Sequence, residues 1–295
     1  MNSYNDKEEK IIEMIESLIR NGVDDELIIS RFESKIFDLK KPELYFWFAK
    51  NVKGIDVKAH EQAVIDKRDP EWNYKFAKNV KGSDINAHGQ VIINSCNLEW
   101  NYKFARDIIG ADVEAHERVI IRNGDPCYNY MFARYIKGAD VRAHGQAIIN
   151  SCNPEWNYKF ARDVKGADVR AHEQAVIDKR DPEWNYKFAR DIIGADVRAH
   201  GRVIINSGDP ELNYIFVRDV KGADVRAHGQ AIINSGDPKW NYLFAEGVKG
   251  ADVKAHEQVV FKYGNQIESE LESLDNYLDD AIASSEKDAS KSMTK

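Results

Sequence analysis

The amino-acid sequence predicts an all-α fold: a right-handed superhelical α-solenoid of eight 28-residue helical hairpins, with a helical cap at each end. Three observations support this fold class. A 28-residue unit recurs eight times without a gap over residues 42–265. Each unit contains two stretches of about 11 residues with the apolar spacing of an amphipathic helix. Turn signals separate these stretches, and helices of this length are stable only when they pack against neighbours.

The first helix of each unit, helix A, has clear start and stop signals. In residues 154–181, Asn153 is the predicted N-cap, and Pro154 takes the first helical position, where it loses no hydrogen bond. Gly166 is the predicted left-handed C-cap, so helix A ends near Val164. Because the loops are short, the second helix, helix B, must pack antiparallel to helix A.

Helix B also has a predicted start and end. Asp168 is its N-cap in residues 154–181. Four units place a glycine where helix B should end: Gly124, Gly208, Gly236 and Gly264. In other units, Arg or Cys occupies this position.

The ends of the chain differ from the repeat. Residues 1–41 hold two apolar-periodic stretches and are expected to form an N-terminal helical cap on the eight-repeat solenoid of residues 42–265. Beyond them, apolar residues follow a 4-3-4-3 spacing: Ile267, Leu271, Leu274, Leu278 and Ala281. This spacing predicts a C-terminal capping helix over residues 266–283, with a dimerising coiled coil as the alternative. The polar residues 284–295 are expected to be disordered.

Two polar columns fall on apolar faces of the predicted helices. An asparagine recurs within the apolar arc of helix A in seven units, and all eight histidines of the chain share one position of helix B. A buried amide needs partners, so we expect each asparagine to bond the backbone of a neighbouring hairpin, with direct ligand contact as the alternative. We expect core histidines, or else a pH-sensitive packing element. Histidines of stacked hairpins would lie ~9–10 Å apart, too far to share a metal ion.

Composition narrows the function classes. The net charge of −7 resides in the two ends: residues 1–41 carry −3 and residues 266–295 carry −5, which leaves +1 for the repeats. No apolar run approaches the ~18 residues of a membrane span, and the first residues do not resemble a signal peptide. The three cysteines are not spaced for zinc, and stacking separates Cys96 from Cys152. We therefore expect a cytoplasmic protein without metal or cofactor.

Helix A carries the large aromatic residues, whereas helix B is built from Ala, Val, Ile and Gly. We therefore expect the B helices to form the tighter, concave row. Its outer face bears a mainly basic column, followed four residues later by Gln or Arg. The candidate partner-binding residues are Arg142, Gln146, Arg170, Gln174, Arg198, Arg202, Arg226 and Gln230. The alternative is a solvated outer face. A basic column on helix A is expected to be salt-bridged.

One column of helix B alternates between two residue types. In the eight successive units it reads Glu61, Gly89, Glu117, Gly145, Glu173, Gly201, Gly229 and Glu257. Two slightly different hairpin packings explain this alternation, and the alternative is a readable one-repeat, one-letter code of the kind that some RNA-binding repeats use.

The hairpin array resembles the α-solenoid class that includes HEAT, armadillo and tetratricopeptide repeats, in architecture only, because 28 residues is a shorter period than theirs. The resemblance implies a scaffold for peptides or proteins, or sometimes nucleic acid. We therefore expect a non-catalytic, monomeric protein that binds a protein or peptide on its concave surface. A nucleic-acid-binding repeat protein that uses the Arg and Lys columns, a self-assembling rod and a dimer stay as alternatives. No phosphate loop or nucleophile–base pair indicates an enzyme.

Overall fold

The computed structural model describes the backbone of residues 6–292 and the side chains of residues 7–278. Within this part the chain forms α-helices joined by short turns, with no strand, which confirms the all-α solenoid of helical hairpins. None of the described helices is long and apolar enough to cross a membrane. The chain divides into two compact units, residues 1–168 and residues 169–295, which are described separately.

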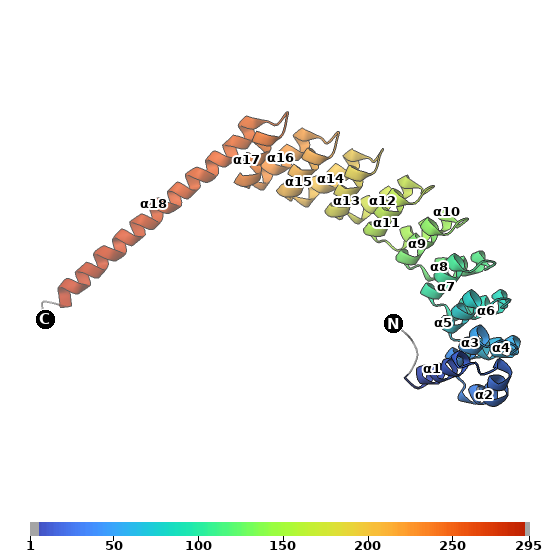
Figure 1. The fold of residues 1–295 in the computed structure, drawn as a ribbon. Helices are drawn as coiled ribbons and strands as arrows, with labels where there is room; N and C mark the ends of the chain where they lie inside the picture. Colours follow the sequence, from blue (N-terminus) through green and yellow to red (C-terminus); the bar gives the residue numbers. More distant parts are fainter. Residues whose placement is uncertain (1–5, 293–295) are drawn as a thin grey trace. The chain divides into compact units, whose positions relative to one another are not determined.

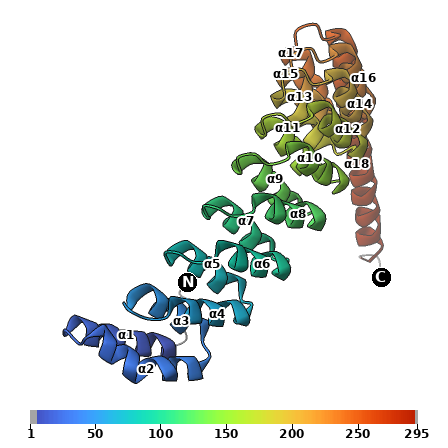
Figure 2. The ribbon, with the colours of Figure 1, turned by 90° about the vertical axis from the view of Figure 1, so that its right-hand side faces the viewer.

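Within each unit the hairpins follow one another along the chain, with A helices on one side and B helices on the other (Figures 1 and 2). The N-terminal helices are α1 (Asp6–Arg20) and α2 (Asp25–Leu39). The A helices are α3 (Pro42–Asn51), α5 (Pro70–Asn79), α7 (Leu98–Asp107), α9 (Pro126–Tyr135), α11 (Pro154–Asp163), α13 (Pro182–Asp191), α15 (Pro210–Asp219) and α17 (Pro238–Gly247). The B helices are α4 (Val57–Lys67), α6 (Ile85–Ser95), α8 (Val113–Asn123), α10 (Val141–Asn150), α12 (Val169–Lys179), α14 (Val197–Ser207), α16 (Val225–Ser235) and α18 (Val253–Ser292).

The predicted caps explain where the helices begin and end. Before α5, the Asp69 carboxylate accepts hydrogen bonds from the backbone N–H groups of Glu71 (2.9 Å) and Trp72 (3.2 Å). Pro70 follows Asp69 as the first residue of α5. Gly82, with φ of 79°, turns the chain, and Asp84 then caps α6. Local hydrogen bonds and backbone preferences therefore set each hairpin before any packing with a neighbour is considered.

The core is shared between successive hairpins. Each A helix places one fully buried phenylalanine inside, and the facing B helix adds a fully buried Val or Ile in the hairpins that precede the last one. Phe104 of α7 packs with Ala77 of α5 and Ile92 of α6, which belong to the preceding hairpin. A single hairpin would leave half of this cluster exposed, so neighbouring hairpins stabilise one another.

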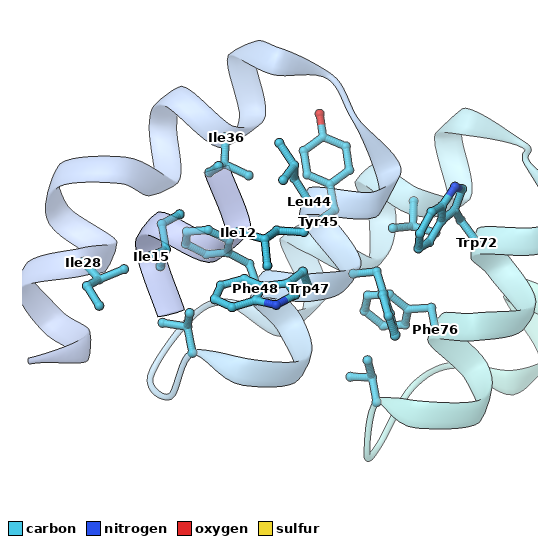
Figure 3. Close-up of a cluster of buried hydrophobic side chains, with 14 residues drawn as sticks. Ile12, Ile15, Ile28, Ile36, Leu44, Tyr45, Trp47, Phe48, Trp72 and Phe76 are labelled. Carbon is cyan, nitrogen blue, oxygen red and sulfur yellow. The ribbon is translucent and has the colours of Figure 1, made fainter. Parts of the chain in front are cut away.

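Residues 6–39 form a degenerate hairpin that covers the first repeat. Ile12 and Ile15 of α1 and Ile28 and Ile36 of α2 pack around Phe48 of α3 (Figure 3). The α2 residue Glu33, 28 positions before Glu61, places its carboxylate 3.0 Å from Nε2 of His60. The cap therefore repeats a side-chain contact of the regular hairpins, which is described below.

The C-terminal part differs from our expectation. We predicted a separate capping helix over residues 266–283 and disorder over residues 284–295, but α18 runs without a break to Ser292, and residues 293–295 lie outside the described part. Gly264, the expected end of helix B, lies inside α18. Asn and Gln follow it instead of the usual Asp-Pro, so no new N-cap forms, and a helix tolerates one glycine at about 1 kcal/mol. Leu271 and Leu274 are 57% and 54% exposed, so this segment does not cover the hairpins.

Within residues 6–292, five residues other than glycine adopt the left-handed backbone conformation, four of them after B helices. Replacing one of them, Arg68 (φ 53°), with glycine is expected to raise the free energy of unfolding by roughly 0.5–1 kcal/mol, because a side chain is strained in this region. Gly124→Ala, at the equivalent position of α8, should lower it by about 1 kcal/mol. Urea denaturation measures both. Equal midpoints for the two variants would contradict this account.

Candidate functional site

The two polar columns meet inside six hairpins of the described structure, the first being that of α5 and α6. Asn73 donates hydrogen bonds from Nδ2 to the backbone oxygens of Val64 (3.3 Å) and Asp69 (2.8 Å), and its Oδ1 accepts one from Nδ1 of His88 (2.7 Å). Val64 belongs to the preceding hairpin, so the predicted bond to a neighbouring backbone is confirmed. Both side chains are 0% exposed. This arrangement rules out ligand contact by Asn73 in the folded hairpin.

The same Asn–His geometry recurs in both units. The Oδ1–Nδ1 distance is 2.7–2.8 Å in five further hairpins: Asn101–His116, Asn129–His144, Asn185–His200, Asn213–His228 and Asn241–His256. Because Nδ2 donates to two carbonyls, the atom that faces histidine is Oδ1, and Nδ1 must carry a proton. The second ring nitrogen, Nε2, is then free to hold a lone pair. These histidines are thus core residues with a defined tautomer.

The residue in the alternating column determines which group lies next to Nε2 of the histidine in the following hairpin. Glu61 accepts a hydrogen bond from the backbone N–H of Asp84 in the next hairpin (2.6 Å) and lies 3.2 Å from Nε2 of His88. Glu117 makes the equivalent contacts with Asp140 (2.6 Å) and His144 (3.1 Å). Burial raises the pKa of the Glu61 carboxyl. A glutamate at this position therefore joins two hairpins.

Glycine in this column gives a second packing. A Cβ at Gly89 would come within 3.3 Å of the Phe104 ring and 3.5 Å of His116 Nε2, so the next hairpin occupies the space of the missing side chain. Nε2 of His116 has no partner in the described structure. The alternation thus reflects two packings, and because Glu61 and Glu117 are only 8% exposed, a partner could not contact the column at these two positions.

Burial shifts the acid–base behaviour of the histidines. It lowers the pKa of His88, His116, His144 and His228 to about 4. The described residues contain no group of three His, Cys, Asp or Glu side chains placed to hold a metal ion. Because of these low pKa values, the four histidines are neutral imidazole rings at neutral pH.

On the outer face of the A helices, arginine and aspartate side chains of the chain form ion pairs with each other. Arg106 contacts both carboxylate oxygens of Asp107 (2.6 and 3.1 Å), and Tyr74 donates to Asp107 from the preceding A helix (2.5 Å). These contacts hold the pKa of Asp107 far below its usual value. Equivalent Arg–Asp pairs occur at Arg162, Arg190 and Arg218. The prediction of a salt-bridged face on helix A is confirmed.

The rows of A and B helices are spaced differently. In residues 1–168, successive A helices contact each other more extensively than successive B helices do. Our expectation of a tighter, concave B row is wrong in this unit. Large side chains tie the A helices together, as in the Tyr74–Trp100 and Tyr130–Trp156 ring contacts (5.3 and 5.5 Å).

Grooves therefore open along the B helices. In the first unit they lie between α4 and α6 (about 560 Å³), α6 and α8 (about 620 Å³), and α8 and α10 (about 510 Å³). In the second unit the groove between α12 and α14 has a volume of about 730 Å³, and another of about 370 Å³ lies between α16 and α18. Each is lined by aliphatic side chains beside polar ones.

All eight candidate binding residues are exposed on this row. Gln174 and Arg202 line the groove between α12 and α14, Arg226 and Gln230 line that between α16 and α18, and Gln146 lines that between α8 and α10. The remaining candidates, Arg142, Arg170 and Arg198, lie in the first turns of their helices, outside these linings.

The arginines of this row differ from those of helix A in their partners. Within residues 7–278, none of Arg142, Arg170, Arg198, Arg202 and Arg226 forms an ion pair, and the glutamines bond only within their own helices where a bond is formed. Their guanidinium groups are therefore available to a ligand. On the B row, the chain does not use these charges for its own fold.

A third column, near the C-terminal end of helix B, also lines the grooves, although our candidate set omitted it. Its members in these linings are Asp66, Asn94, Arg122, Asn150, Asp178 and Asn206. The sequence signal that could have identified this column is that its residues vary between repeats that are otherwise similar.

Comparisons with protein-family models, with curated proteins and with solved structures find no match to this chain. The resemblance to helical repeat proteins therefore concerns architecture: regular pairs of helices that pack against their neighbours.

Proposed function

We propose that this protein is a non-catalytic binding scaffold that recognises a protein or peptide along the B helices. The observation that carries the proposal is the contrast between the two rows. Arg106, Arg162, Arg190 and Arg218 on helix A are paired with aspartates, whereas Arg202 and Arg226 on the B row line grooves and form no ion pair within residues 7–278. Unpaired guanidinium groups can form bidentate hydrogen bonds with carboxylates.

The grooves indicate the form of the ligand. Each has an aliphatic floor, such as Ile177 and Val203 between α12 and α14, and a polar rim that includes Gln174 and Arg202. An extended segment with apolar and acidic side chains would place one apolar group in each groove and a carboxylate beside each arginine. The three free cysteines suit a reducing compartment, so we place the scaffold in the cytoplasm, as a monomer in the absence of its partner.

Two features favour protein over nucleic acid. The helices α4, α6, α8, α10, α14 and α16 carry no exposed aromatic side chain on which a base could stack. Acidic side chains share the row, because Asp66 and Asp178 line the same grooves as Arg68 and Arg202. A nucleic acid carries a negative charge at every phosphate and would meet these carboxylates, whereas a peptide can present neutral side chains to them and acidic ones to the arginines. A structural rod would leave the unpaired arginines without a role.

The test replaces Arg142, Arg170, Arg198 and Arg226 with serine together. Partner capture, measured by pull-down with mass spectrometry from the source cell with and without nuclease, should be lost. The unfolding midpoint should change little, because exposed charges contribute ~0–1 kcal/mol each. The matched control replaces the exposed loop residues Lys137, Lys165, Lys221 and Lys249 with serine, which changes the net charge equally.

Four outcomes are informative. Loss in the arginine variant alone supports the B-row assignment. Equal loss in both variants would indicate general charge attraction, and intact capture would move the contact surface to helix A or the loops. Nuclease-sensitive capture that weakens ~10³-fold between 50 and 200 mM salt would identify nucleic acid as the partner.

A further inference from the structure

Beyond the last hairpin, helix α18 carries a row of solvent-exposed apolar side chains. Its members are exposed: Ile267 38%, Leu271 57%, Leu274 54% and Leu278 48%. At 100° per residue, their spacing places them on the side of α18 that His256 and Val260 use inside the hairpin. His256 is 1% exposed, so one helix face is buried at its start and uncovered further along. Such a row on a charged helix is typical of a helix-pairing surface.

The row has the heptad register of a coiled coil. With Leu271 and Leu278 at positions a, Ile267 and Leu274 fall at positions d. The flanking e and g positions hold Glu268, Glu270, Asp275 and Tyr277, all exposed. Residues 263–278 contain four acidic and no basic residues. The seam is therefore apolar with acidic borders. Ala281, which continues the spacing, lies outside the residues whose side chains are described.

These borders disfavour pairing with a second copy. In a parallel pair, Glu270 of one helix would face Asp275 of the other, because g positions meet e positions of the next heptad. In an antiparallel pair, e meets e and g meets g, so Glu268 or Glu270 would again meet acidic groups. Like charges across the seam destabilise the pair at neutral pH.

We propose that α18 is the acidic strand of a heterotypic coiled coil, and that its occupant is an amphipathic helix of another protein with apolar a and d residues and Lys or Arg at e and g. The seam would bury the four apolar side chains, and the partner's cations would lie beside Glu268, Glu270 and Asp275. Tyr277, 73% exposed at a g position, offers its ring to one of these cations. This surface is separate from the B-row grooves and does not depend on the scaffold function.

The experiment uses the full chain and three synthetic peptides of about four heptads. One has Leu and Ile at a and d with Lys at e and g, the second has Glu at e and g, and the third keeps Lys but has Ser at a and d. Fluorescence anisotropy at neutral pH and physiological salt should show binding of the first peptide only. Binding of the third peptide as tight as that of the first would mean unspecific attraction to an acidic protein and would overturn the proposal.

Two variants sharpen the test. Leu271→Ser with Leu274→Ser should weaken binding of the first peptide about 100-fold, since two apolar contacts are lost. Glu268→Lys with Glu270→Lys and Asp275→Lys should transfer binding to the second peptide, with a change in preference of about tenfold or more. This gain of binding cannot come from misfolding. Unchanged preference would contradict the proposed role of the acidic borders.

Sedimentation of the unmodified chain tests the other occupant. We expect a monomer at neutral pH in the absence of peptide. A dimer that Leu271→Ser with Leu274→Ser converts to monomer would assign the seam to a second copy and overturn the proposal of a basic partner.

Discussion

Replacing Asn101 with leucine is expected to lower the free energy of unfolding by about 3 kcal/mol, which is the upper end of the range for one unsatisfied buried polar group. Within the described residues, the ring of His116 makes one side-chain hydrogen bond, from Nδ1 to Asn101, and its Nε2 has no partner. The substitution leaves the whole imidazole without a partner inside the core. Chemical denaturation with circular dichroism measures the loss.

A matched variant separates this effect from the change in shape. In Asn73→Leu, the His88 ring can carry its proton on Nε2 instead and donate it to Glu61, so we expect a smaller loss, about 1–2 kcal/mol. Adding His116→Leu to Asn101→Leu removes the orphaned ring and should restore most of the stability. A double variant whose loss equals the sum of the single losses would show that the Asn–His hydrogen bond is not the source of the effect.

Acidification is expected to unfold the hairpin stack between pH 6.5 and 4. The ordinary pKa of histidine is 6.5, and burial lowers that of His116 and His228 to about 4. In this window the unfolded chain binds protons that the folded chain excludes, so the stability that neutral imidazole contributes is complete above pH 6.5 and is lost as the pH falls. Each such histidine accounts for up to about 3 kcal/mol at 1.4 kcal/mol per pKa unit. His88 and His144 act in the same direction.

The neighbouring carboxyls oppose this trend in part. Burial raises the pKa of Glu61 and Glu117, so these groups take up protons more readily in the folded state as the pH falls. They lie beside His88 and His144, whereas the units of His116 and His228 follow Gly89 and Gly201. The test is the unfolding free energy measured at several pH values. The double variant Asn101→Leu with His116→Leu should reduce the slope by up to one proton, and an unchanged slope would contradict the assignment.

The local structure of the hairpins was readable from the sequence alone. Asp69, Pro70, Gly82 and Asp84 act within a few residues of the turns that they form, so their effects do not depend on distant parts of the chain. The burial of Asn73 and His88 followed from their helical positions in the same way. The pairing between the two side chains was not foreseen, because it requires the distance between two helices.

The tertiary structure decided the features that depend on neighbouring hairpins. Small residues on helix B suggested close packing, but the Tyr74–Trp100 contact draws the A helices together and leaves grooves along the B row. Glu61 could be understood only once the backbone of Asp84 lay beside it. The continuation of α18 through Gly264 likewise depends on the absence of a following hairpin cap, since a single glycine does not end a helix. Turns are local, whereas spacing and burial arise from contacts between hairpins 28 residues apart.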